Sequence, residues 1–198
     1  FRRVLFRSKP LIHSPRLIDF DNKRLYFRSK VRPEERMHYG TLRINVRREH
    51  VFEDSFYQLR HRSSDELRCK LSVQFTGEEG IDAGGVSREW YQVMAREIFN
   101  PNLALFIAVP DGASTFQPNP NSIIQNDRGV NHLDFFKFVG RLVGKAVYDG
   151  QLIDAHFTRS FYKHMLNQPL TYQDLEAVDL DFYKQMKWIL EKDRKSVV

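Results

Sequence analysis

The sequence predicts an α+β fold that is mostly helical and carries a few short strands. Several long stretches repeat apolar residues at three- and four-residue spacing, which is the period of an amphipathic helix. Two short segments instead alternate apolar and polar residues, which is the period of a half-buried strand. Hydrophobic residues make up 41% and charged residues 28% of the 198 residues, so the chain has a globular composition and enough length for a sizeable core.

The first half of the chain predicts helices and strands in alternation. Phe20, Phe27 and Val31 share one helical stripe, and Pro33 ends that helix because proline lacks the amide hydrogen that a helix interior needs. The predicted elements are, in order, a helix over 17–31, a strand over 42–46, a helix over 51–59 and a strand over 71–75.

The second half begins with a glycine-rich loop over 77–85. We expect Ser87 to cap the helix that follows, because a serine side chain can accept a hydrogen bond from a free amide of the first turn. Residues 111–126 are rich in Pro, Asn and Ser and predict a loop. Gly150 predicts the end of the strongest helical pattern. The predicted elements are a helix from Ser87 to Ile98, an apolar run over 103–109, a helix over 132–149, a helix marked by Phe157, Phe161 and Met165, a short helix opened by a Thr171 and Asp174 capping box, and a helix marked by Phe182, Met186 and Ile189.

Composition excludes several classes of protein. No apolar run is long enough to span a bilayer, and the first residues lack the apolar core of a secretory signal. The chain has one cysteine, Cys69, which excludes an internal disulfide framework and a metal site with several cysteines. We therefore expect a reducing compartment, cytoplasmic or nuclear, and no membrane partner.

The formal net charge of +6 comes mainly from the two ends. Residues 1–8 and 193–198 follow neither helical nor strand period, and both resemble translated adapter DNA. We expect neither end to be natural protein. Without them the chain keeps 26 basic and 24 acidic residues, so the charge no longer favours a nucleic-acid partner.

Cys69 is the first candidate for chemistry. Arg68 and Lys70 flank it, and cationic neighbours can lower the pKa of a thiol and create a nucleophile. However, neighbouring residues of an extended strand point to opposite sides, so these cations need not approach the sulfur. Free cysteines are also among the most buried residue types. We expect Cys69 to be structural.

The other candidates are weaker. Residues 140–146 resemble a phosphate-binding loop, but the two glycines are one residue too close and Ala146 replaces the magnesium-binding Ser or Thr. We expect Gly140 and Gly144 to permit close helix packing instead. His156 and His164 belong to no metal-binding motif. We interpret the acids of the glycine-rich loop as a solvated turn rather than as an acid/base pair; they are Glu78, Glu79 and Asp82.

One extended motif resembles a known family. FTGEEGIDAGGVSREW, residues 75–90, resembles the signature of HECT-type ubiquitin ligases. Further segments resemble that family in its order, and FDNKR at 20–24 and YFR at 26–28 resemble its giant members in particular. These segments are FQPNPNS at 116–122, FFKFVGR at 135–141, GKA at 144–146, DGQL at 149–152, FTRSFYK at 157–163 and WILE at 188–191.

The resemblance implies a catalytic domain of two lobes. One lobe docks a ubiquitin-conjugating enzyme, and a cysteine of the other lobe accepts ubiquitin as a thioester and passes it to a substrate lysine. Residues 9–192 resemble the large subdomain of the first lobe, an incomplete HECT domain. The resemblance implies that the catalytic cysteine lies downstream of this chain, that no residue here is catalytic, and that no metal or organic cofactor is used.

Two other functions remain open from the residues alone. The chain could be a non-catalytic helical protein-interaction domain, or a basic nucleic-acid binder. The second alternative depends on the charge of the ends and predicts steeply salt-dependent binding.

Overall fold

The structure, a computed structural model, describes residues 14–31, 40–78, 84–109, 114–126 and 129–196. It is mostly helical, with short strands in two small sheets, which confirms the predicted fold class. The elements, with η for a 3-10 helix, are η1 (Pro15–Leu17), α3 (Phe20–Val31), β1 (Thr41–Val46), η2 (Arg48–His50), α4 (Val51–Leu59), α5 (Ser64–Arg68), β2 (Lys70–Phe75), α6 (Gly85–Ile98), η3 (Pro101–Leu103), β3 (Phe106–Ala108), β4 (Thr115–Pro118), η4 (Ser122–Gln125), α7 (His132–Asp149), β5 (His156–Phe157), α8 (Arg159–Met165), η5 (Tyr172–Ala177) and α9 (Leu180–Ser196).

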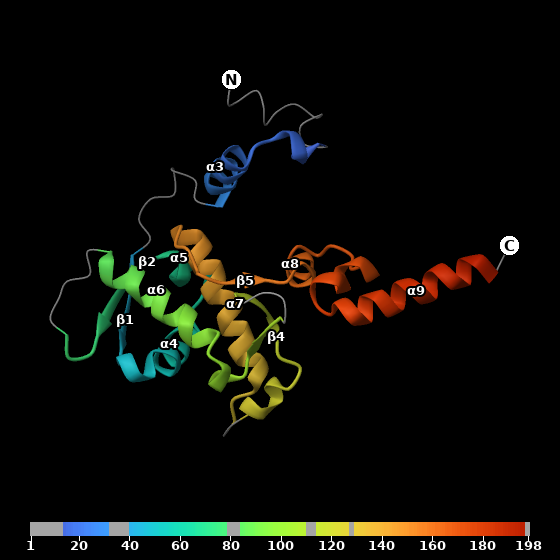
Figure 1. The fold of residues 1–198 in the computed structure, drawn as a ribbon. Coiled ribbons are helices and arrows are strands. Elements are labelled where there is room, and N and C mark those ends of the chain that lie inside the picture. Colours follow the sequence, from blue (N-terminus) through green and yellow to red (C-terminus); the bar gives the residue numbers. More distant parts are fainter. Residues whose placement is uncertain (1–13, 32–39, 79–83, 110–113, 127–128, 197–198) are drawn as a thin grey trace.

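The main core lies between the β1–β2 sheet and the helices α4, α6 and α7 (Figure 1). The two strands are parallel, with Leu42 beside Leu71 and Val46 beside Phe75. Every second residue of each strand is buried, as the alternating sequence pattern predicted. We call residues 41–149, which contain this core, the body.

Aromatic rings fill the centre of the body. Phe52 and Phe56 of α4 meet Phe135 and Phe138 of α7, with ring centroids 4.7–5.7 Å apart. Such tilted and edge-on contacts add to the energy of apolar burial. Trp90 of α6 is fully buried among them. The helical stripes that predicted α4, α6 and α7 therefore converge on one core.

A second sheet leads out of the body. Its strand order is β3, β4, β5, with β4 antiparallel to β3 and parallel to β5. Phe157 of β5 packs beside Phe99, Phe106 and Phe161, with ring centroids 4.8–5.7 Å apart. Beyond β5, the segment of α8, η5 and α9 points away from the body in Figure 1. We call residues 159–192 the arm.

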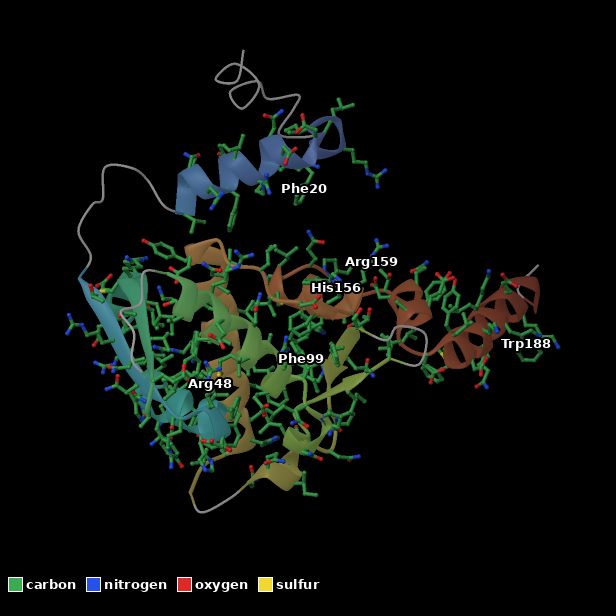
Figure 2. The ribbon with its side chains drawn as sticks, turned by 60° about the vertical axis from the view of Figure 1, so that its left-hand side comes forward. Phe20, Arg48, Phe99, His156, Arg159 and Trp188 are labelled. Atoms are coloured by element: carbon green, nitrogen blue, oxygen red, sulfur yellow. The ribbon has the colours of Figure 1, made fainter. Side chains whose placement is uncertain are left out.

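The arm and α3 leave many apolar side chains exposed. No residue of α3 is buried, so the stripe of Phe20 and Phe27 that predicted this helix faces solvent. Trp188 of α9 is 58% exposed, and Figure 2 shows it far from the body. Among the described residues, no helix is both long and apolar enough to cross a membrane.

Several local predictions were wrong. Ser87 is not a cap: α6 begins at Gly85 after Gly84, and the Ser87 hydroxyl donates to the Leu71 carbonyl instead. The predicted loop over 111–126 contains β4 and η4. Phe157 belongs to β5, so α8 starts later than predicted. The short helix α5, with its Ser63 capping box, was not predicted.

The remaining predictions concern three glycines, one capping box and the two ends of the chain. Gly150 ends α7 with φ of 72°, and Thr171 with Asp174 forms the predicted capping box. The expected close packing at Gly140 and Gly144 is wrong, because a Cβ there would meet nothing within 4 Å. The prediction about the two ends stays a prediction: residues 1–8 lie outside the described residues, as do the side chains of 193–196 and all of 197–198.

Candidate functional site

A polar cluster that involves Glu78 and Glu89 of the family-like motif is centred on Arg48 of η2. Its guanidinium binds both carboxylate oxygens of Glu78, which follows β2, and its Nη1 donates to Glu89 of α6 at 2.7 Å. The guanidinium carbon also lies 4.0 Å from the centroid of the Phe75 ring. One cation thus joins the end of β2 to the first turns of α6, on either side of the glycine-rich loop.

The electrostatics of this cluster are those of an ion pair. The hydrogen bonds from Arg48 lower the pKa of Glu78, and those to Glu78 and Glu89 raise the pKa of Arg48. Glu78 therefore stays ionised and cannot act as a general acid at neutral pH. Glu78 is 48% exposed where the turn follows β2, which agrees with the predicted solvated turn, and it is paired with Arg48 there. Glu79 and Asp82 lie outside the described residues.

Cys69 lies where α5 ends and β2 begins. Its side chain is half-buried, and its sulfur lies 3.6 Å from the Asp65 carbonyl oxygen. That is a weak contact to a backbone acceptor, which does not stabilise a thiolate. The Cys69 carbonyl oxygen accepts a hydrogen bond from Lys145 at 2.8 Å. The residue is thus held by backbone and packing contacts.

Lys145, the lysine of the segment that resembles a phosphate loop, lies inside α7 and points into the protein. Its side chain is 4% exposed, and its ammonium donates to Asp149 at 2.8 Å as well as to Cys69. The Tyr91 hydroxyl donates to the other oxygen of Asp149 at 2.9 Å. Burial and the Asp149 charge raise the pKa of Tyr91. These contacts leave no place for a phosphate.

The remaining candidates do not assemble into a site. In the described part of the chain, no group of three or more His, Cys, Asp or Glu side chains could hold a metal ion. His156 and His164 lie on β5 and α8. A cavity of about 10 Å³ lies among Leu42, Trp90 and Phe138, which is room for about one water molecule.

The Arg48 cluster was missed by sequence reasoning. Arg48 is 30 residues from Glu78 and 41 from Glu89, so spacing alone could not connect them. The available indication was an arginine at the end of a predicted strand, followed by acids after the next predicted strand.

Comparison with known proteins identifies relatives along the whole length of the body and arm. Residues 92–198 match the HECT-domain (ubiquitin-transferase) family. The chain is 56% identical over 189 residues to the E3 ubiquitin-protein ligase UPL2 of Arabidopsis thaliana, 46% over 190 residues to the E3 ubiquitin-protein ligase ptr1 of Schizosaccharomyces pombe, and 46% over 184 residues to the E3 ubiquitin-protein ligase HUWE1 of Mus musculus.

These matches cover almost all of this chain but little of the relatives. They span 95%, 95% and 92% of the chain, and only 5%, 6% and 4% of the three relatives. All three relatives are named as ligases, which does not favour a non-catalytic interaction domain.

Proposed function

The chain belongs to the HECT-domain (ubiquitin-transferase) family, and from that premise we propose that it forms part of the catalytic domain of a HECT-type E3 ubiquitin ligase. The observation that carries this proposal is the 56% identity to a named ligase over 95% of the chain. Residues 9–192 form the large subdomain of the lobe that serves as a scaffold. A reducing compartment, cytoplasmic or nuclear, suits its single free thiol.

The reaction proceeds in two transfers. A ligase thiolate attacks the thioester carbonyl that joins ubiquitin to the conjugating enzyme, so a new thioester forms and the thiolate of that enzyme is released. A substrate lysine amine then attacks the new thioester, an isopeptide bond forms, the amine gives its proton to a base, and the ligase thiolate is regenerated. The partners are therefore a conjugating enzyme, ubiquitin and a protein substrate.

The thiolate of this reaction is not Cys69, which is the only cysteine of the 198 residues. Its sulfur contacts the Asp65 carbonyl, and Arg68 beside it is paired with Asp65 at 2.9 Å. Lys70 lies on the exposed side of β2. These contacts support a structural cysteine, so the catalytic thiol belongs to the parent protein outside these residues.

The body performs positioning rather than bond chemistry. The Arg48 cluster joins β2 to α6 across the glycine-rich loop, and the aromatic core fixes α4 against α7. A rigid scaffold of this kind raises the effective concentration of two partners, provided that both are held in place.

A thioester-loading assay on the complete catalytic domain of the parent protein tests this proposal. Activating enzyme, a panel of conjugating enzymes and labelled ubiquitin are mixed with the domain, and products are separated on a non-reducing gel. We expect a thiol-sensitive adduct that persists in Cys69→Ala. No adduct with any conjugating enzyme, from a folded domain, would contradict the proposed function.

A further inference from the structure

The buried cluster of Tyr91, Lys145 and Asp149 has no part in the proposed reaction, and its energetics call for an explanation. Lys145 and Asp149 form an ion pair with side chains 4% and 18% exposed. Taking two charges out of water costs free energy that their attraction offsets only in part. Apolar side chains of similar size at these positions are commonly as stable or more stable. Stability alone therefore does not account for the cluster.

The hydrogen bonds of the cluster reach three separate elements. Lys145 and Asp149 are one turn apart at the end of α7, Tyr91 comes from α6, and the Cys69 carbonyl comes from the chain just before β2. Tyr91 is almost fully buried, and its OH is directed at Asp149. Each bond has a directional requirement, which apolar contacts lack.

The position of the cluster along α7 gives it a consequence. Gly150 ends the helix directly after Asp149, and the backbone N–H of Gln151 donates to Ala146 at 2.9 Å. From there the chain passes to β5 and the arm (Figure 1). The last turn of α7 is thus the last helical turn of the body before the chain leaves it, and the cluster fastens that turn to α6 and to the start of β2.

We propose that Tyr91, Lys145 and Asp149 act as one interlocking unit that fixes the last turn of α7 against α6 and the start of β2. The unit contributes more to the position of this helical turn than to the free energy of unfolding. All three members can therefore be exchanged together for apolar residues without unfolding the body. Removing one member leaves a buried group without its partner and destabilises the protein more than the full exchange does.

The test compares single and combined substitutions in the 198-residue chain. Lys145→Met leaves Asp149 without its cation and lowers the melting temperature by on the order of 10 °C. The triple variant Lys145→Met, Asp149→Leu, Tyr91→Phe loses less than half of that. A triple variant that unfolds, or whose loss equals the sum of the three single losses, would overturn the proposal. A Lys145→Met chain that fails to fold beside a folded triple variant supports it.

Amide hydrogen exchange tests whether the unit holds the last turn of α7 in place, apart from its effect on the melting temperature. In the triple variant we expect the amides of Gly150 and Gln151 to exchange about tenfold faster than in the unsubstituted 198-residue chain, because the last turn of α7 has lost its directional hydrogen bonds. Unchanged exchange at these amides would show that the unit does not fix the turn. Arg68→Met is the matched control, since it removes an exposed cation 2.9 Å from Asp65 and should leave the Gly150 and Gln151 amides unaffected.

Discussion

The two tryptophans of the chain differ in burial, and this difference reflects the two regions in which they lie, the body and the arm. Trp90 in the body is fully buried, and its indole N–H donates to Ser55 at 3.0 Å. Trp188 in the arm is 58% exposed, with the Lys192 ammonium 4.4 Å from its ring centroid. The same residue type is core in one region and surface in the other.

The difference shows what holds each region together. The body is stabilised by apolar burial in a continuous core. The arm depends on a polar lock, in which the buried Asp174 carboxylate accepts from Lys163 at 2.6 Å and from the Thr171 amide at 2.8 Å, with Arg159 3.6 Å away. Tyr172 and Tyr183 also stack between η5 and α9 at 6.1 Å. We infer that the two regions respond to different perturbations.

The difference between body and arm is tested most strongly by making the same substitution, tryptophan to alanine, in each region. Trp90→Ala should lower the free energy of unfolding by about 3–5 kcal/mol, because it removes a large buried side chain. Trp188→Ala should change it by less than about 1 kcal/mol, because the ring is already exposed. Urea denaturation measures both values. Equal losses would mean that Trp188 belongs to a core and that the two regions do not differ.

A smaller effect tests the polar contact inside the body. Ser55→Ala leaves the Trp90 N–H buried without an acceptor and should lower the free energy of unfolding by about 1–3 kcal/mol. In a Trp90→Phe background the same change should cost less than about 0.5 kcal/mol, because phenylalanine has no N–H to satisfy. A loss that is the same in both backgrounds would assign the effect to packing.

The polar lock of the arm predicts a local response to Asp174→Asn. The amides of Val178 and Asp179, which donate to Leu175 in η5, should exchange faster by on the order of tenfold, because hydrogen bonds to a charged group are lost. Amides of β1 and β2 should not change. Faster exchange throughout the body would show that arm and body open together.

Acid should release the same lock. The hydrogen bond from Lys163, with those from Thr171, lowers the pKa of Asp174 from 3.8 to about 2. Because the folded value lies below the unfolded one, the stabilisation is present above pH 4 and is lost as the pH falls from about 4 to 2. Exchange in η5 should rise over that window, and Asp174→Asn should remove the rise. Asp54, whose pKa is also lowered to about 2 by Arg47, serves as the body reference.

A pair of glycines, one inside α7 and one directly after it, gives the smallest changes in stability. Gly150→Ala should destabilise by about 1–2 kcal/mol, because its φ of 72° is left-handed and a Cβ would come within 2.5 Å of the Arg28 side chain. Gly140→Ala, in the middle of α7 with open space around it, should stabilise by about 0.5–1 kcal/mol. Thermal unfolding measures both shifts, and a stabilising Gly150→Ala would contradict the assignment of the helix end.

The sequence predicted α7 to the residue because its period is long and Gly150 marks its end; the structure adds Asn131, whose side chain accepts from the Leu133 amide at the start of the helix. It did not predict β4, which pairs with the distant β5 by placing Thr115 beside His156 and whose last residue is Pro118. Ser87 misled for a related reason: its hydroxyl bonds to β2, a tertiary contact that overrides the local capping preference.

The same limit applies to the candidate site residues: local patterns were predictable from sequence, and contacts between distant residues were not. Local spacing indicated that residues 140–146 lie inside a helix, and the structure agrees. Spacing could not show that Lys145 meets Tyr91 and Cys69, because those contacts join residues far apart in the chain. Motif resemblance predicted the family, and the three-dimensional contacts were needed to say what each motif residue holds.

The central claim is that this chain is scaffold and that its only thiol is structural. The most direct measurement is the loading assay on the 198-residue chain alone, with activating enzyme, conjugating enzymes and labelled ubiquitin on a non-reducing gel. We predict no thiol-sensitive adduct on this chain, in a reaction where the complete catalytic domain becomes loaded. An adduct on the 198-residue chain that Cys69→Ala abolishes would contradict the claim and make Cys69 the nucleophile.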